Sequence, residues 1–533
     1  MEQHTTPTES LQYQNLLLDR ILTQDITQEL SLPDYQPEIK RLLRVNATIQ
    51  PPTRYIGGGN IEFSGNVDFT VLYAGEDGAL YCFPFTSEYV LHTTADAESP
   101  LSYFPDNTLC CYATPEAESA GGRVLGPRKL NVRCRIRAHV HAWANCSTEE
   151  AWSGTLHGIP QRLREEVSCA KMLHGNAAPA TVHDEILLER DLAGEDTRIV
   201  TADATLLPEE VTPTSDRVNC RGQLCLKLLL QRDPTPGEDA DHATAPPPVI
   251  LTRKLPFTAE IPVTGLLPGG EAVVQGSCTE LHLTLEDGKL LCDATIALEA
   301  RTQHKETLSY TRDLCCIGQQ STVELQNSHV PSPIRCINTN LSQSELLTAQ
   351  EFGAPAGATV IDVWAGVQPE TVTITTEGNR CIITGSCHYH LLYRNDAEFS
   401  TREIERPFRC SVDMGQNRFT SAAPGHDCTV QVIHAKARAD EREGRVSIDT
   451  ELSIAMRLWE YQSISPVSTV TLGKECTVPA AQRTIYYPAP NENVWSVAKR
   501  YCSSVDALCR KNHLPDIRAD HPDSLGGAHS LVI

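Results

Sequence analysis

The chain has 533 residues, 40% of them hydrophobic and 21% charged, which is typical of a globular protein long enough for several domains. Acidic residues number 68 and basic residues 45, and the resulting formal net charge of −23 repels phosphate backbones and anionic lipids, so nucleic-acid and bare-membrane partners are not expected. No apolar run approaches the roughly 20 residues that span a bilayer and residues 1–6 do not open a signal peptide, so we expect a cytoplasmic protein without a transmembrane segment.

Residues 1–30 are predicted to form a helical segment ahead of the first domain. The apolar residues of this segment are spaced as on one face of a helix: Leu16, Leu17, Leu18, Ile21, Leu22 and Ile26. The partner of this face could be the first domain or another protein.

Three parts of the chain then share one alternating pattern, which begins at Gly65, Gly222 and Gly385. After each glycine, apolar residues take every second position, as in a strand with one buried face. An extended stretch that contains an alanine precedes each glycine, and a Pro-Phe pair follows it. These landmarks are Ala47, Ala204 and Ala365, and Pro84-Phe85, Pro256-Phe257 and Pro407-Phe408.

A further alternating stretch closes each copy and starts at Leu130, Leu290 and Val446. The landmarks recur with a period of about 160 residues, which indicates a triplicated domain rather than a solenoid of short repeats. We therefore predict a mainly β protein with three antiparallel β domains, over residues 31–160, 175–310 and 330–465. Each domain would be a sandwich or a partly open barrel around its own core.

Residues 482–533 have a different character and are predicted to form a small α+β module in the order strand, helix, helix, strand. Val494, Val497, Ala498 and Tyr501 make a short helical stripe. Ser503 with Asp506 resembles a capping arrangement for the second helix. Residues 531–533 can pair as a final strand with residues 484–487.

Residues 32–45, with the sequence LPDYQPEIKRLLRV, resemble the start of the SPOCS domain in SipL-type spore-coat morphogenesis proteins. The resemblance continues through residues 65–73 and, more weakly, into the two later copies. It implies that the three β domains belong to this domain family.

Residues 491–514, with the sequence NENVWSVAKRYCSSVDALCRKNHL, resemble a LysM module. Family members usually have Gly-Asp-Thr in place of residues 491–493, in a loop that approaches N-acetylglucosamine in glycan-binding members, and glycine in place of Cys502. Trp495 could stack on a sugar, anchor a protein partner, or simply fill the core of so small a module. The resemblance yields seven candidate contact residues for a partner or a glycan: Asn491, Glu492, Asn493, Val494, Trp495, Leu514 and Pro515.

The resemblance implies a non-catalytic scaffold or adaptor of spore-coat assembly at the forespore surface, in the mother-cell cytoplasm. Its LysM-like module would contact a coat-morphogenetic ATPase, and its β domains would join other coat proteins. The alternative is a peptidoglycan-binding protein, which the altered loop at residues 491–493 disfavours. An enzyme whose site is assembled across the β domains is least favoured, because the copies share no distinctive polar constellation.

Patterns that could carry chemistry have simpler explanations in this sequence. Ser496 and Lys499 match an SxxK pattern, but they fall inside a helix of the LysM-like segment, without the accompanying elements of acyl-transfer enzymes. The chain has 20 cysteines, none in a CxxC pair, and we expect them to be reduced and to act as small buried hydrophobic residues. Neither a catalytic residue, a metal site nor another cofactor is therefore expected.

Two histidine pairs would each place two imidazoles on one strand face, which is half of a metal site. His139 and His141 continue a polar face that already holds Arg133, Arg135 and Arg137, so a solvated face is the favoured interpretation. His388 and His390 alternate with apolar residues in the same way, and no matched carboxylate pair joins them in the sequence.

Overall fold

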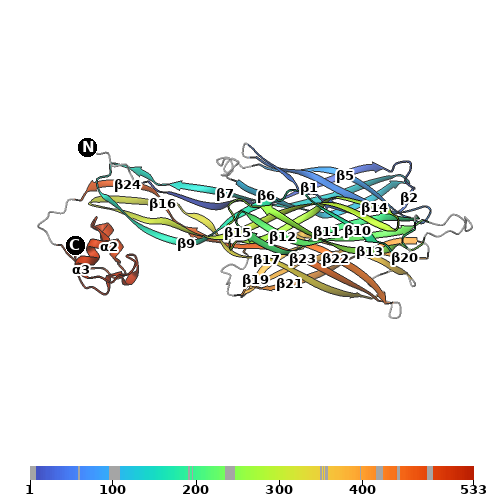
Figure 1. Ribbon diagram of the computed structural model, residues 1–533. Coiled ribbons are helices and arrows are strands. Elements are labelled where there is room, and N and C mark those ends of the chain that lie inside the picture. The colour runs from blue at the N-terminus through green and yellow to red at the C-terminus, as the bar shows by residue number, and fades with distance from the viewer. Residues whose placement is uncertain are drawn as a thin grey trace, which may run out of the picture.

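The computed structural model describes residues 8–57, 60–94, 109–189, 192–194, 196–233, 246–348, 351, 353, 358–396, 398–415, 424–440, 445–476 and 484–533. Strands predominate in these ranges, which confirms the expected mainly β fold. The strands form an elongated body, and helices α2 (Val494–Arg500) and α3 (Val505–Asn512) lie at one end of it (Figure 1).

Unit 1, which comprises β1 to β7, consists of two antiparallel sheets around one apolar core. One sheet has the order β1 (Ser10–Ser31), β7 (Lys129–Glu149) and β6 (Leu109–Gly126). In the other, β4 (Asn60–Gly75) pairs with β2 (Ile39–Ile49), β3 (Thr53–Gly57) and β5 (Leu80–Thr94). Alternate residues of β4 and β7, such as Phe69 and Ile136, are buried between the sheets. Their period-two spacing gives each strand its one buried face.

Units 2 and 3 show the same pairing order. In unit 2, β15 (Lys289–Ile317) pairs with β9 (Ile159–Asn176), β10 (Ala180–Leu187) and β14 (Glu271–Glu286), and β12 (Arg217–Arg232) lies between β11 (Thr197–Thr214) and β13 (Val249–Pro262). In unit 3, β23 (Arg445–Ile464) lies between β17 (Ser328–Leu347) and β22 (Gly425–Asp440). Its second sheet joins β20 (Arg380–Asn395) to β18 (Thr359–Val367), β19 (Thr373–Glu377) and β21 (Glu398–Asp413), with the short helix η3 (Pro369–Thr371) beside it. That the three units are copies of one domain family stays a prediction from the sequence.

The repeated glycines have a shared structural role. Gly65, Gly222 and Gly385 each lie directly opposite an aromatic residue of the neighbouring strand, namely Tyr89, Phe257 and Phe408. A Cβ atom at any of the three glycines would lie 2.9 Å or less from that aromatic ring. The glycine therefore makes room for the ring to lie across the strand, an arrangement known to support glycines in sheets. In unit 1 the ring is that of Tyr89, whereas Phe85 of the Pro-Phe pair stacks on Phe69.

The predicted N-terminal helix is wrong within the described residues, because this segment is β1. It pairs with β7 along its whole length, from Ser10 opposite Glu149 to Ser31 opposite Lys129, and residues 1–7 lie outside the described residues. A register shift between Leu16 and Leu18 interrupts the alternation, which produced the spacing that resembles a helix. The partner strand is about a hundred residues or more away in the chain, so tertiary pairing overrides the local pattern.

Three short strands extend the body towards the helices. β8 (Ala151–Ser153), β16 (Gln319–Leu325) and β24 (Val467–Glu475) form a sheet with the far end of β15, in the order β15, β16, β24, β8. β24 and β8 run parallel, and the other pairs in this sheet are antiparallel. One strand from each third of the chain therefore contributes to this sheet, close to α2 and α3 (Figure 1).

The three units meet in two apolar clusters. In one, Trp143 of unit 1, Met172 of unit 2 and Trp459 of unit 3 are fully buried against one another. The other joins residues of all three units: Leu43, Leu72, Ala74, Leu80, Val200, Leu229, Trp364, Leu392 and Phe399. Because each cluster needs all three units, we infer that the units stabilise one another.

Charged side chains also cross between the units. Arg301 of unit 2 and Arg457 of unit 3 both pair with the buried Asp427, and the Arg457 guanidinium donates to the Tyr112 hydroxyl of unit 1. Elsewhere, Lys227 of unit 2 pairs with Asp362 of unit 3 at 2.7 Å. A cavity of about 1510 Å³ lies between the units and is lined by β2, β6, β11, β14, β18 and β22.

All 20 cysteines are free thiols in buried or half-buried positions. Cys134, Cys292 and Cys381, for example, belong to the cores of units 1, 2 and 3. Burial raises the pKa of Cys220 to about 12 and that of Cys292 to about 11. These thiols are therefore protonated and poorly nucleophilic near neutral pH.

Candidate functional site

The C-terminal module, residues 484–533, contains all seven candidate contact residues. Strand β25 (Ile485–Tyr486) pairs antiparallel with β26 (Leu531–Val532), and α2 and α3 lie between them in the chain, followed by the short helix η4 (Pro522–Leu525). Val494, Val497 and Ala498 of α2 pack with Leu508 and Leu531 in a small core. The order of elements is the one expected from the sequence, whereas membership of the LysM family stays a prediction.

Both helices begin at side-chain caps, which explains where the chain turns. Asn493 caps α2, since its Oδ1 accepts from the Ser496 backbone N–H at 2.8 Å and Ser496 Oγ accepts from the Asn493 N–H at 3.1 Å. Ser504 caps α3 by accepting from the Ala507 N–H. The cap of α3 is therefore Ser504, one residue after the predicted Ser503.

The loop before α2 is held by hydrogen bonds within the module. Glu492 accepts from the Tyr486 hydroxyl at 2.6 Å and from the Ala489 N–H at 2.8 Å, and it pairs with Arg500. The Tyr486 hydrogen bond is the largest cause of the lowered pKa of Glu492. Asn493 Nδ2 donates to the Asp520 carbonyl at 3.0 Å. The polar groups of Glu492 and Asn493 are therefore already paired, whereas Asn491 is exposed with a positive φ of 70°.

Trp495 is buried, but outside the module's own core. Its ring packs against Leu163 of β9 and Cys315 of β15, and its Nε1 donates to Asp313 Oδ2 of β15 at 2.8 Å. The Lys499 ammonium pairs with the other oxygen of the same carboxylate. Trp495 therefore fixes the module on the β body, a role that none of the three sequence-based hypotheses for this residue included.

Further hydrogen bonds hold the module on the β strands. We call the contact surface on the strands the seat and define it as Gln161, Asp313, Cys315 and Gly318. Gln161 Oε1 accepts from the Val505 N–H at 2.8 Å, and its Nε2 donates to the Ser503 carbonyl. The Gly318 N–H donates to the Cys502 carbonyl at 2.8 Å. No local sequence signal marks Gln161 or Asp313, because both lie on strands far from the module in the chain. Asp313 lies beside a register shift in the pairing of β15 with β9.

The remaining candidates differ in exposure. Val494 lies in the module core and Leu514 is half-buried, whereas Pro515 is exposed. Large apolar side chains that the sequence analysis did not single out are also exposed on the module, at Ile485, Tyr487 and Ile517. Ile485 precedes Tyr486 on β25 and projects from the face opposite to Tyr486, which packs towards the core, and Tyr487 directly follows the strand.

The SxxK residues are engaged in separate structural contacts. Ser496 Oγ donates to the Asn493 carbonyl at 2.8 Å as part of the cap, and Lys499 is directed to Asp313. The Lys499 ammonium is therefore held by a carboxylate rather than placed as a base beside Ser496.

The histidine pairs are less exposed than the sequence suggested. Arg133 and Arg135 are exposed as expected, but the solvated-face interpretation is wrong for His141, whose side chain is fully buried. The reason is that β7 runs into the junction of the three units, where Tyr112 stacks on His141 and Trp459 meets it edge-on. His388 and His390 are half-buried and line the cavity between the units.

The chain matches no family model, and neither a curated protein nor a solved structure matches it. Within the described ranges, no helix combines the length and apolar character needed to cross a bilayer. The functional conclusion therefore rests on the sequence patterns and on the geometry of the module and its seat.

Proposed function

We propose that this protein is a non-catalytic scaffold or adaptor of spore-coat assembly, which acts in the mother-cell cytoplasm at the forespore surface. Its C-terminal module would bind another protein, by resemblance a coat-morphogenetic ATPase, and the three β units would join other coat proteins. The assignment to spore-coat assembly rests on the resemblance of residues 32–45 and 491–514 to SipL-type proteins.

The observation that carries the proposal is the contact of Trp495 with strands β9 and β15. A tryptophan engaged by Asp313, Leu163 and Cys315 of the β body holds the module in one orientation. A fixed module presents a constant outer face, including the exposed Ile485 and Tyr487, to a partner. Large apolar side chains that are exposed to solvent are suited to contact with a protein.

The same geometry disfavours peptidoglycan as the ligand. A glycan in the loop of residues 491–493 would have to compete with the hydrogen bonds that Glu492 and Asn493 already make within the module. Replacing such bonds leaves polar groups unpaired unless the sugar satisfies each of them. Trp495 is also unavailable for stacking, since its ring is covered by the β body.

The localisation of the protein tests this proposal. A fluorescent protein fused to the N-terminus is expected to form a shell or cap around the forespore of a sporulating endospore former. Loss of the shell when residues 484–533 are deleted would assign targeting to the module. Signal on the vegetative wall, or a diffuse signal at every stage of sporulation, would contradict the proposal.

A further inference from the structure

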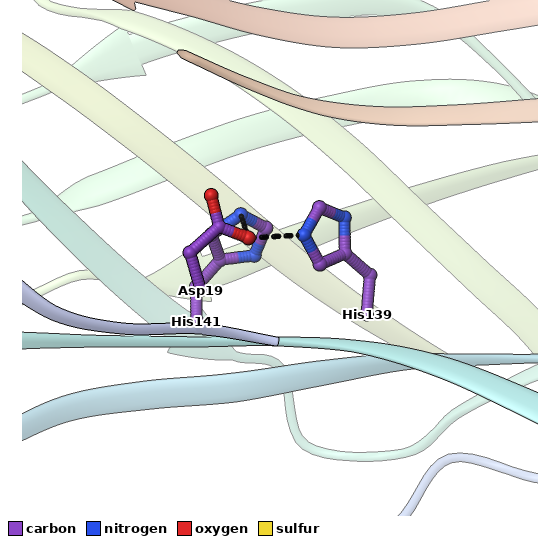
Figure 2. A group of neighbouring side chains, drawn as sticks. All are labelled: Asp19, His139 and His141. Carbon is purple, nitrogen blue, oxygen red and sulfur yellow. Dashed lines mark hydrogen bonds and ion pairs between the residues drawn. The ribbon is translucent and has the colours of Figure 1, made fainter. Parts of the chain in front are cut away.

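We propose that Asp19, His139 and His141 form a binding site for a divalent transition-metal ion, at the point where β1 pairs with β7 (Figure 2). Two imidazoles and one carboxylate are a ligand set found for zinc and for other first-row divalent ions. Such a set leaves further coordination positions for water. The site lies outside the C-terminal module and does not depend on the function proposed for it.

Strand geometry brings the three side chains together. His139 and His141 are two residues apart on β7 and so share one face of the sheet, with ring centroids 4.1 Å apart. Asp19 lies directly opposite His141 in the register of β1 and β7, while Ile21 lies opposite His139. The carboxylate therefore meets both rings from the neighbouring strand.

The ligand atoms converge on the space beside the carboxylate. Asp19 Oδ1 lies 2.5 Å from His139 Nε2 and 3.7 Å from His141 Nε2, and Figure 2 shows both rings turned towards this oxygen. With metal–ligand distances of about 2.0–2.2 Å, atoms on one ion would be roughly 3–3.5 Å apart. The observed separations lie on either side of this range, so small side-chain rotations suffice to admit the ion.

His141 is the residue that points to a ligand rather than to a simple ion pair. Its side chain is fully buried, yet neither ring nitrogen has a hydrogen-bond partner. An unpaired buried polar group of this kind destabilises the fold, and coordination of an ion would engage Nε2.

The surroundings of the site allow an ion to enter. Asp19 is 44% exposed, so one side of the site is open, while Tyr112 and Trp459 hold the His141 ring in place. Asp427 adds a negative charge near His141, and Arg457 adds a positive one. Because no hydrogen bond to Nδ1 fixes the tautomer of His141, we expect affinity in the micromolar range rather than tighter.

A second cluster with the same pattern serves as a comparison. His390 lies opposite Glu403, His388 lies two residues away on the same strand, and the ion-pair distances are 3.5 and 3.6 Å. Here His390 is half-buried and only its Nδ1 is buried without a hydrogen-bond partner, whereas His141 is fully buried and both of its ring nitrogens lack one. We therefore place the ion at Asp19 rather than at Glu403.

Titration of the full chain with Co²⁺, followed by visible absorption, tests the site. One equivalent is expected to bind with weak d–d bands and without the near-ultraviolet charge-transfer band of a cysteine ligand, and Zn²⁺ is expected to displace it. Asp19→Asn and His139→Gln should each weaken binding at least about 10-fold, because each removes one ligand from three. Both side chains are partly exposed, so these variants should keep the fold, as unchanged thermal unfolding without metal would show.

Two control variants make the result specific. Asp293→Asn removes a carboxylate that pairs with His183 alone, and His388→Gln removes a ligand of the comparison cluster, so both should bind Co²⁺ like the unaltered chain. Absence of binding at millimolar Co²⁺, equal affinity in Asp19→Asn, loss of binding in His388→Gln, or a thiolate charge-transfer band would each overturn the proposal.

Discussion

Replacing Asp427 by alanine is expected to lower the free energy of unfolding by about 3–5 kcal/mol. Asp427 is buried, and its two oxygens pair with Arg301 at 2.6 Å and with Arg457 at 3.2 Å. Both guanidinium groups are also buried, so removal of the carboxylate leaves two positive charges without their shared partner. Urea unfolding followed by circular dichroism measures the loss.

The exposed ion pair between Arg217 and Glu260 supplies the matched control, because it lies at 3.0 Å but in solvent. Glu260→Gln should change stability by no more than about 0.5 kcal/mol. If Asp427→Ala were as mild as Glu260→Gln, the buried network would not join the units as described.

The ion pairs of Asp427 also determine how the free energy of unfolding changes at acid pH. Burial alone would raise the pKa of Asp427, but the two guanidinium groups outweigh it and hold this pKa well below its usual range. Burial is likewise outweighed at Glu299, where Arg301 and His174 lower the pKa from 4.5 to about 2. Carboxyl groups with lowered pKa values stabilise the fold above their ordinary pKa, and this contribution is lost as the pH falls through the lowered value. We therefore expect the free energy of unfolding to decrease as the pH is lowered from about 4.5 to 2. The decrease should be smaller in Asp427→Ala, which lacks this carboxyl group.

Trp459→Ala is expected to cost a similar 3–5 kcal/mol, by loss of packing rather than of charge. The Trp459 ring is fully buried and meets Trp143 of unit 1 edge-on, with ring centroids 5.1 Å apart. It also fills the space opposite Gly425, where a Cβ atom would lie 2.2 Å from the indole nitrogen. Truncation would open a cavity where the three units meet.

Chemical unfolding of Trp459→Ala beside Tyr35→Ala checks this expectation. Tyr35 is 82% exposed, so its truncation should stay within about 0.5 kcal/mol. A loss below about 1 kcal/mol for Trp459→Ala would mean that the junction relaxes around the cavity and contributes little to stability.

Local periodicity was enough to predict the regular strands and the module. The alternation after Gly65, Gly222 and Gly385 corresponds to β4, β12 and β20, whose inward residues are buried as expected. The helical stripe of Val494, Val497 and Ala498 likewise corresponds to the buried face of α2. These features depend on neighbours in the sequence, which is why the pattern reveals them.

Features that depend on distant partners could not be predicted in this way. The local spacing of β1 predicts a helix because its pairing with β7 and the irregularity near Leu17 are not visible locally. The alternation of β7 predicts a solvent-exposed His141 because it does not show that other units cover this side chain. The role of Asp313 is not visible in the sequence because its partners, Trp495 and Lys499, are far along the chain.

Binding of the purified full chain to a purified coat-morphogenetic ATPase tests the central claim most directly. We expect saturable binding that falls at least about 10-fold in the double variant Ile485→Ser, Tyr487→Ser and is unchanged in Leu187→Ser, which alters an equally exposed apolar residue on β10. No co-sedimentation with peptidoglycan sacculi is expected. Sacculus binding that is lost in Asn491→Ala, together with no binding to the ATPase, would contradict the scaffold and identify the module as a glycan-binding one.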